Sequence, residues 1–179
     1  MTISALIVAA GRGSRAGQGL PKQYRAVGGL MVLSRTIRAL LANEQIDQVR
    51  VVIHPDDETL YQQAAPDDPR LGAPIHGGAE RAISVRLGLD AIAAEAPAMV
   101  LIHDAARPFV SGKTISDVIS ALDSHAGALA AVPVVDALRR SKDGLCSDAV
   151  DRNDVWRAQT PQGFHFDRIL AAHRVNKDP

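Results

Sequence analysis

The stretch LIVAAGRGSRAGQGLPKQY, from Leu6 to Tyr24, indicates both the fold and the kind of ligand. It begins with five apolar residues, which predict a buried strand, and then turns into a glycine-rich loop. Glycine lets the backbone turn where a Cβ would clash, and so brings several N–H donors against one ligand. The loop contains four glycines and three cations: Gly11, Gly13, Gly17, Gly19, Arg12, Arg15 and Lys22. We therefore expect an anion cradle after the first strand, with polyphosphate as its ligand.

The N-terminal part of the chain is basic, although the chain as a whole has a net charge of zero. No Asp or Glu precedes Glu44, whereas six cations do: Arg12, Arg15, Lys22, Arg25, Arg35 and Arg38. This local excess favours an anionic ligand near the N-terminus. The overall balance of 20 basic and 20 acidic residues argues against a nucleic acid or an anionic membrane as the partner.

The composition is typical of a single α/β domain. Of 179 residues, 46% are hydrophobic but only 3% are aromatic, so Ala, Val, Leu and Ile must build the core, as in parallel strands packed by helices. No apolar run is long enough to span a membrane, and the N-terminus lacks the pattern of a secretory leader. The single Cys146 cannot form an internal disulfide and lies in a polar, turn-like stretch. We expect a cytoplasmic protein.

Strands and helices alternate along the chain. Apolar spacing predicts helices near residues 33–41, 79–95, 115–122 and 166–175, with a short one beginning at 56. Apolar runs predict buried strands at 6–10, 49–53, 99–102 and 126–132, and a further strand begins at 75. Residues 135–154 are too polar for a core element and too many for a tight connection, so they predict a projecting β-arm. The expected fold is α/β, with a mostly parallel central sheet flanked by helices.

Three segments are expected to meet at one edge of this sheet, because such sheets bind ligands beyond the carboxyl ends of their strands. They are the glycine loop, the pair Gly77–Gly78, and Asp104 after the strand at 99–102. Asp104 could hold a magnesium ion shared with phosphates, or it could cap a turn or pair with Arg107. His103 alternates to the other face of the strand and is expected to be a packed side chain rather than a ligand.

Two familiar nucleotide motifs are excluded. Gly11-x-Gly13-x-x-Ala16 matches the dinucleotide fingerprint, but that fingerprint opens a helix directly, and Pro21 with its neighbouring glycines forbids one here. No acid follows about 20 residues later to bind a ribose. Gly112-Lys113-Thr114 resembles the end of a P-loop, but Arg107 stands where that motif needs glycine. Residues 111–114 more simply begin a helix.

Six motifs carry a family resemblance: LIVAAGRGSR, LPKQY, GGAERAISVRLGL, HDAARP, VPVVDALRR and VDRNDVWRAQTPQGF. In this order and at these separations they resemble 2-C-methyl-D-erythritol 4-phosphate cytidylyltransferases, the third enzymes of the non-mevalonate isoprenoid pathway, over residues 5–169. The resemblance implies a fold of the nucleotide-diphospho-sugar transferase type, CTP as substrate, and Mg²⁺ or another divalent cation. It also implies a homodimer in which the arm reaches into the neighbour's site.

The resemblance also assigns roles to single residues. Arg15 and Lys22 would hold the phosphates of CTP and stabilise the transition state, and Asp104 would hold the metal. Arg152 would act across the dimer, in catalysis and in binding methylerythritol phosphate. The nucleotide would be lined by Ala9, Ala10, Gly11, Gly77, Gly78 and Ser84. The acceptor would be bound by Arg107, Arg152 and Thr160.

The chain departs from the family pattern in two places. Ala137 stands where the family usually has a threonine of the acceptor site. The family also continues for several tens of residues beyond the position of Pro179, so residues 1–179 are expected to be a cytidylyltransferase domain without its C-terminal segment. In some bacteria this domain is fused to 2-C-methyl-D-erythritol 2,4-cyclodiphosphate synthase. A cytidylyltransferase for another polyol phosphate, such as ribitol 5-phosphate, and a non-catalytic nucleotide-binding module stay open as alternatives.

Overall fold

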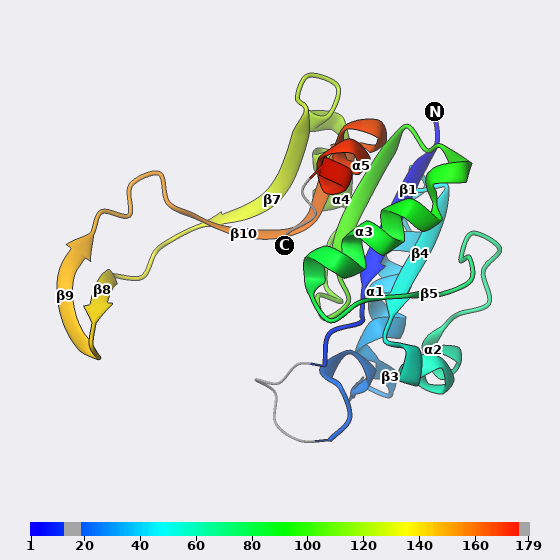
Figure 1. The fold of residues 1–179 in the computed structure, drawn as a ribbon, viewed down its shortest axis with the longest axis horizontal. Coiled ribbons are helices and arrows are strands. Elements are labelled where there is room, and N and C mark those ends of the chain that lie inside the picture. Colours follow the sequence, from blue (N-terminus) through cyan, green and yellow to red (C-terminus); the bar gives the residue numbers. More distant parts are fainter. Residues whose placement is uncertain (13–18, 176–179) are drawn as a thin grey trace.

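A six-stranded sheet in the order β5-β4-β1-β6-β10-β7 forms the centre of the computed structural model, which describes residues 1–12 and 19–175 (Figure 1). Parallel pairing joins β1 (Ile3–Val8) to β4 (Gln48–Ile53) and β6 (Met99–Asp104), and β4 to β5 (Ile75–His76). β10 (Trp156–His165) runs antiparallel to both β6 and β7 (Gly127–Pro133). The predicted α/β fold with a mostly parallel sheet is confirmed.

Apolar side chains cover both faces of the sheet, because successive residues of a strand point to opposite sides. In β1, Ala5 and Ile7 pack into the core beneath α1 (Val32–Leu41), α2 (Glu58–Ala64) and α4 (Gly112–Ala121). Leu6 packs into the other core, beneath α3 (Arg81–Ala91) and α5 (Phe166–Val175). All three β1 side chains are fully buried. The apolar run at the start of the chain is therefore the central strand of a two-sided core.

Local signals place most helices where the sequence predicts them. The hydroxyl of Ser111 accepts a hydrogen bond from the Thr114 amide (3.1 Å) and so caps α4, as expected. A short 3-10 turn, η3 (Pro55–Asp57), precedes α2. The helix expected at 79–95 is α3 followed by a second 3-10 turn, η4 (Ala93–Glu95), and it ends where Ala96 adopts a left-handed conformation with φ 43°.

Two features of the sheet differ from expectation. The strand predicted at 126–132 exists as β7, but its predicted burial is wrong, because β7 lies at the edge of the sheet and Leu129 is 50% exposed. β10 was not anticipated. It contains Pro161 and Gly163 and has a register shift between Ala158 and Gln162. These features are uncommon inside strands, so the sequence pattern does not predict a strand here.

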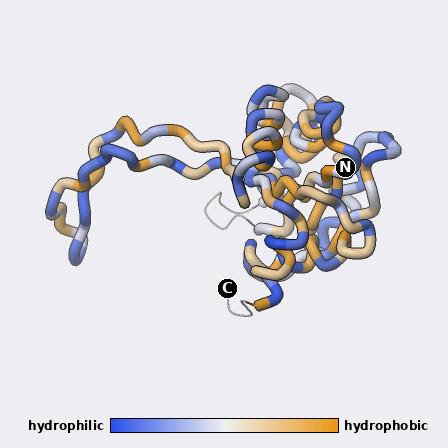
Figure 2. The backbone as a smooth tube through the Cα atoms, turned by 90° about the horizontal axis from the view of Figure 1, so that it is seen from above, coloured by the Kyte–Doolittle hydropathy of each residue, from blue (hydrophilic) through white to orange (hydrophobic). Residues whose placement is uncertain are grey.

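The expected arm is confirmed as a hairpin of β8 (Leu138–Lys142) and β9 (Leu145–Val150), which extends away from the body (Figure 1). Asp143 and Gly144 form its two-residue turn with φ values of 51° and 79°, the left-handed conformations that such turns require. Figure 2 shows hydrophobic and hydrophilic residues interspersed along the arm. Among them Leu145 is 75% exposed.

The segment that leads from the glycine loop to α1 contains a 3-10 turn, η2 (Lys22–Tyr24), and a small hairpin of β2 (Ala26–Val27) and β3 (Leu30–Met31). Tyr24 is buried, so this turn holds the end of the loop against the core. Within residues 1–12 and 19–175, every helix is too short or too polar to cross a membrane.

Candidate active site

A cavity of about 570 Å³ opens at the carboxyl ends of β1 and β6. The pairing of Val8 with Asp104 brings the ends of these two strands together, and the N-terminus of α3 closes the opposite side. The three predicted segments therefore meet in space. Seven residues from the predicted set line the cavity: Ala9, Gly11, Lys22, Gly78, Ser84, Asp104 and Arg107.

Gln23 holds the end of β1 against η2. Its side-chain amide is buried and donates to the carbonyl oxygens of Ala9 (2.7 Å) and Gly11 (3.1 Å). Both partners only accept hydrogen bonds, which identifies the bonding atom as the amide nitrogen. Lys22, the neighbouring residue, is thereby held at the cavity wall.

Ala10 and Gly77 pack against each other beside the wall formed by Ser84. A Cβ on Gly77 would lie 2.5 Å from Cβ of Ala10 and 2.8 Å from the Ser84 hydroxyl oxygen, which is closer than real contacts allow. The Ser84 hydroxyl oxygen accepts a hydrogen bond from the Gly78 amide (3.1 Å). Glycine at position 77 therefore permits a close approach between the glycine loop and the start of α3.

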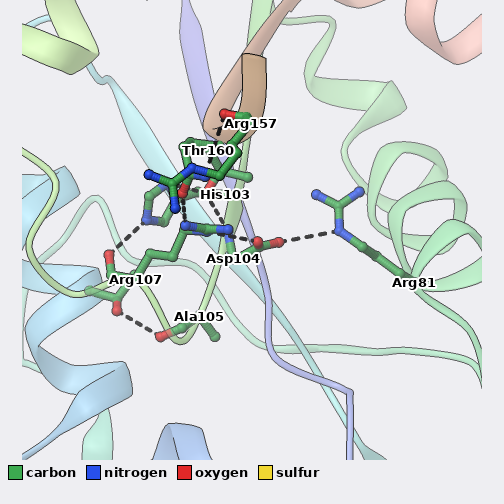
Figure 3. Close-up of polar contacts among 9 residues, drawn as sticks. Arg81, His103, Asp104, Ala105, Arg107, Arg157 and Thr160 are labelled. Atoms are coloured by element: carbon green, nitrogen blue, oxygen red, sulfur yellow. Dashed lines mark hydrogen bonds and ion pairs between the residues drawn. The ribbon is translucent and has the colours of Figure 1, made fainter. Parts of the chain in front are cut away.

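Asp104 is held between two guanidinium groups (Figure 3). Nε of Arg107 lies 3.0 Å from its Oδ2, and Nε of Arg81 lies 3.2 Å from its Oδ1. Burial alone would raise the pKa of Asp104, but the hydrogen bonds and charges of Arg107 and Arg81 outweigh it and lower that pKa below its ordinary value. Asp104 is therefore a carboxylate at neutral pH, and the sequence-based alternative of a pair with Arg107 is present in the structure.

The fit of Asp104 to a magnesium ion can be judged from its oxygen atoms. Within the described part of the chain, no three His, Cys, Asp or Glu side chains gather closely enough to hold a metal. A single carboxylate suffices for magnesium when phosphates and water supply the remaining ligands. Each carboxylate oxygen has one guanidinium partner and keeps a second lone pair, so a metal could bind Oδ1 beside Arg81. The chemistry of Asp104 therefore fits a magnesium ion.

His103 lies behind Asp104 and is fully buried, as predicted for a packed residue. Its Nε2 is 3.0 Å from the carbonyl oxygen of Arg107, and its Nδ1 is 3.1 Å from the hydroxyl oxygen of Thr160 (Figure 3). The Thr160 hydroxyl also accepts a hydrogen bond from the Asp104 amide (3.1 Å). Burial lowers the pKa of His103, which keeps the ring neutral at pH 7.

The sequence matches a known protein family. The family described as 2-C-methyl-D-erythritol 4-phosphate cytidylyltransferase matches residues 3–179. The chain belongs to this family. The Bifunctional enzyme IspD/IspF of Paramagnetospirillum magneticum is 55% identical over 95% of the chain, which spans 44% of that relative. The 2-C-methyl-D-erythritol 4-phosphate cytidylyltransferase of Cereibacter sphaeroides is 44% identical over 98% of the chain and 78% of its own length. The chain thus spans less than half the length of the bifunctional relatives it matches.

Solved structures of the cytidylyltransferase family share the fold. The 2-C-methyl-D-erythritol 4-phosphate cytidylyltransferase of Thermus thermophilus has a TM-score of 0.79 at 31% identity, over 99% of this chain and 77% of that one. The 4-diphosphocytidyl-2C-methyl-D-erythritol synthase of Anaerococcus prevotii has a TM-score of 0.82 at 28% identity, over 97% and 74%.

Several residues that the family resemblance singles out are not among the described residues that line the cavity. Arg15 falls outside the described residues. Arg152 is in the arm, where it donates a hydrogen bond to the carbonyl oxygen of Val135. Ala137 is exposed in the same arm. Thr160 lies behind the wall, bonded to the Asp104 amide.

Arg12 does not join the cavity, although the glycine loop suggested it as one of three cradle cations. Its guanidinium bonds to the carboxylates of Asp57 (2.8 Å) and Asp56 (2.9 Å) and lies 2.6 Å from Nδ1 of His54. Two acids therefore balance its charge. Arg12 fastens the start of the glycine loop to the segment after β4.

Two residues of the cavity are absent from the set that the sequence predicts. Arg81 begins α3 directly after the Gly77–Gly78 segment, and a cation at the start of a helix beside a glycine pair is the signal that could have found it. Gln23 has no comparable signal, because its bonds to Ala9 and Gly11 exist only once the strand and the turn are packed together.

Proposed function

We propose that this chain transfers a cytidylyl group from CTP to 2-C-methyl-D-erythritol 4-phosphate, which gives 4-diphosphocytidyl-2-C-methyl-D-erythritol and pyrophosphate in non-mevalonate isoprenoid biosynthesis. The observation that carries the proposal is the cavity, in a member of this family, where Lys22, Gly78, Ser84 and Asp104 meet. The cavity combines backbone surface for a base with cations for phosphates. On this reading, Ala9, Ala10, Gly11, Gly77, Gly78 and Ser84 contact CTP.

The reaction needs charge stabilisation more than proton transfer. A phosphate monoester oxygen of the acceptor is already anionic near pH 7, so it attacks the α-phosphorus of CTP without a general base. A new P–O bond forms as the bond to pyrophosphate breaks, in line with the attack. Lys22 and Arg15 would offset the charge on the phosphates, and Arg107 adds a cation at the cavity wall. Arg107, Arg152 and Thr160 are the residues proposed to bind the acceptor.

Mg²⁺ or another divalent cation is part of the proposal. Asp104 would hold it, and when bound it would supply Lewis-acid stabilisation of the phosphoryl oxygens. The carboxylate is ionised at neutral pH, as a metal ligand must be, and it lies at the cavity wall. Arg81 would then lie beside the ion, since its Nε contacts Oδ1 of Asp104.

The chain is proposed to act as a homodimer through its arm, with Arg152 completing the partner's site. In support, the arm presents apolar surface without cover from its own chain, including Leu145 at 75% and Val135 at 66% exposure. Cytoplasmic location stays a prediction.

Mixing two inactive variants tests whether Arg152 completes the site of the partner chain. If Arg152 acts across the dimer, Lys22→Ala and Arg152→Ala chains regain activity together, since one site of the mixed dimer has both residues. If mixing restores nothing, Arg152 does not act in this way.

The function itself is tested by pyrophosphate release from CTP with methylerythritol phosphate as acceptor. Lys22→Ala is expected to lower kcat by orders of magnitude while CTP affinity stays close to that of the unaltered chain, whereas Lys113→Ala, an exposed cation paired with Asp117, leaves kcat unchanged. A near-normal kcat for Lys22→Ala would remove Lys22 from catalysis. Preferred turnover of ribitol 5-phosphate would assign another acceptor. CTP binding without pyrophosphate release would indicate a non-catalytic module.

A further inference from the structure

His103 is linked by hydrogen bonds to Asp104 and Arg107 in one wall of the cavity and to Thr160 directly behind it. It is the penultimate residue of β6, fully buried, and both of its ring nitrogens have partners. Nε2 meets the Arg107 carbonyl oxygen at 3.0 Å, Nδ1 meets the Thr160 hydroxyl at 3.1 Å, and that hydroxyl meets the Asp104 amide at 3.1 Å. One buried ring thus connects three residues placed at the proposed metal and acceptor sites.

The partners allow one direction for each of these bonds. A carbonyl oxygen only accepts, so Nε2 of His103 carries the proton and donates to Arg107. The backbone amide of Asp104 only donates, so the Thr160 oxygen accepts from it. In the neutral ring Nδ1 is then the acceptor, and the Thr160 hydroxyl donates its proton to it. Every donor and acceptor in the set is satisfied by this one tautomer.

We propose that His103 is a positioning residue for cytidylyl transfer, which fixes Asp104, Arg107 and Thr160 relative to one another from behind the cavity. The inference rests on the proposed function of the cavity, but it concerns a residue that lies outside the cavity lining. His103 touches neither substrate. It acts through the Arg107 turn on one side and through the Thr160 hydroxyl on the other.

The placement of the partners separates this role from simple core packing. Burying an imidazole costs desolvation, and an apolar side chain of similar volume would fill the same space without that cost. The cost is offset by the hydrogen bonds of the ring to the Arg107 carbonyl and to the Thr160 hydroxyl, which in turn bonds to the Asp104 amide; Asp104 and Arg107 line the cavity, and Thr160 lies directly behind them. Reacting atoms must lie within about 3–3.5 Å in aligned geometry, and a shift of roughly 1 Å costs on the order of 100-fold in rate. A side chain that supports the cavity wall from behind therefore influences the rate of the reaction.

Three substitutions of His103 test the hydrogen bonds on the two sides of the ring separately. His103→Asn keeps an acceptor near the position of Nδ1, for Thr160, and loses the donor to Arg107. His103→Gln keeps a donor near the position of Nε2, for Arg107, and loses the acceptor. His103→Phe loses both and keeps the volume. Exposed His125, four residues beyond the end of α4, provides the matched control as His125→Gln.

In the steady state we expect His103→Phe to lower kcat about 100-fold and the Asn and Gln variants roughly 10-fold each, whereas His125→Gln changes nothing. The KM for CTP should stay within about threefold, because the ring bonds to Arg107 and Thr160 and not to Gly11 or Gly78 of the proposed nucleotide site. Thr160→Val combined with His103→Phe should lower kcat by less than the product of the two single losses, since both remove the hydrogen bond between these two side chains. A His103→Phe enzyme with normal kcat, or losses that follow only the folded fraction measured by thermal unfolding, would overturn the proposal.

A second measurement does not depend on activity. In the long-range ¹⁵N–¹H spectrum of the histidine rings of the unaltered chain, His103 should show a proton on Nε2, protected from exchange, and none on Nδ1. A ring protonated at Nδ1, or one that exchanges freely, overturns the inference even when the enzyme is active. A chain with the expected ring spectrum but no pyrophosphate release contradicts the proposed function while the hydrogen-bond arrangement stands.

Discussion

Nε of Arg81, at the first residue of α3, lies 3.2 Å from Oδ1 of Asp104, at the last residue of β6. This ion pair joins two sides of the cavity and occupies the carboxylate oxygen that faces away from Arg107. Arg81 therefore provides a counter-charge for Asp104, the residue expected to hold a metal. Any cation that binds there competes with a guanidinium.

Arg81→Ala should tighten the binding of a divalent cation in the absence of nucleotide. Removing a positive charge beside Asp104 favours another cation, but both side chains are partly exposed (49% and 33%), so screening keeps the gain to about three- to tenfold in Kd. Manganese binding followed by electron paramagnetic resonance measures it directly. Arg86→Ala, on the same helix but outside the cavity lining, should leave the affinity unchanged. Equal or weaker manganese binding by Arg81→Ala would contradict the prediction.

Gly77→Ala should lower both stability and CTP affinity. The added Cβ would meet Ala10 at 2.5 Å and Ser84 at 2.8 Å, so the glycine loop and α3 must separate, at a cost of about 1–3 kcal/mol in the free energy of unfolding. Gly112→Ala is the control, because a Cβ there meets no atom within 4 Å and should change stability by less than about 0.5 kcal/mol. Urea unfolding and CTP titration of both variants decide the matter. Equal stability of the two would show that the loop accommodates the methyl group.

Gln23→Leu should destabilise the chain by about 1–3 kcal/mol, since the carbonyl oxygens of Ala9 and Gly11 lose their buried donor. The same change should weaken CTP binding, because it releases the turn that carries Lys22. Gln62→Leu, an exposed glutamine on α2, tests whether the loss comes from the hydrogen bonds rather than from the change in side-chain type. Chemical denaturation of both variants provides the comparison. A Gln23→Leu chain as stable as the Gln62→Leu chain would contradict the assigned role.

Tyr24 should make the folded state sensitive to alkaline pH. Burial, together with the charge of Asp57, raises the pKa of Tyr24 well above its ordinary value of 10.0. The unfolded chain then loses this proton more readily than the folded chain, so stability is complete below pH 10 and falls as the pH rises beyond it. Burial raises the pKa of Tyr61 as well, which adds to the loss in the same direction.

Tyr24→Phe is the test of this behaviour. Among the described residues, no group makes a hydrogen bond to the Tyr24 hydroxyl, so its removal should leave the stability at pH 7 equal or higher. The decline above pH 10, followed by urea unfolding, should become shallower and should persist in part through Tyr61. A Tyr24→Phe chain with an unchanged alkaline decline would assign the effect elsewhere.

The sequence by itself determined the features that depend on a few neighbouring residues. The apolar run of β1, the Ser111 cap of α4 and the Asp143–Gly144 turn of the arm all follow from the residues that form them. Because parallel strands end at a common edge, the sequence also indicated that the glycine loop, the Gly77–Gly78 segment and Asp104 meet at one cavity. The sequence did not indicate the order of the strands or which strand lies exposed at the edge of the sheet, as β10 and β7 show.

Only the tertiary structure decided which partners the polar side chains take. Arg12 turns to Asp57, 45 residues away, instead of to the cavity, and Arg81 pairs with Asp104 across 23 residues. His103 bonds to Thr160 across 57 residues, through a strand that the sequence pattern did not reveal. Periodicity, caps and turns act over a few residues, whereas a side chain's hydrogen-bond partner depends on which segments the packed sheet brings together. The sequence therefore indicated which segments meet at the candidate site, and the pairing of β6 with β10 and the ion pair between α3 and β6 assembled its charged wall.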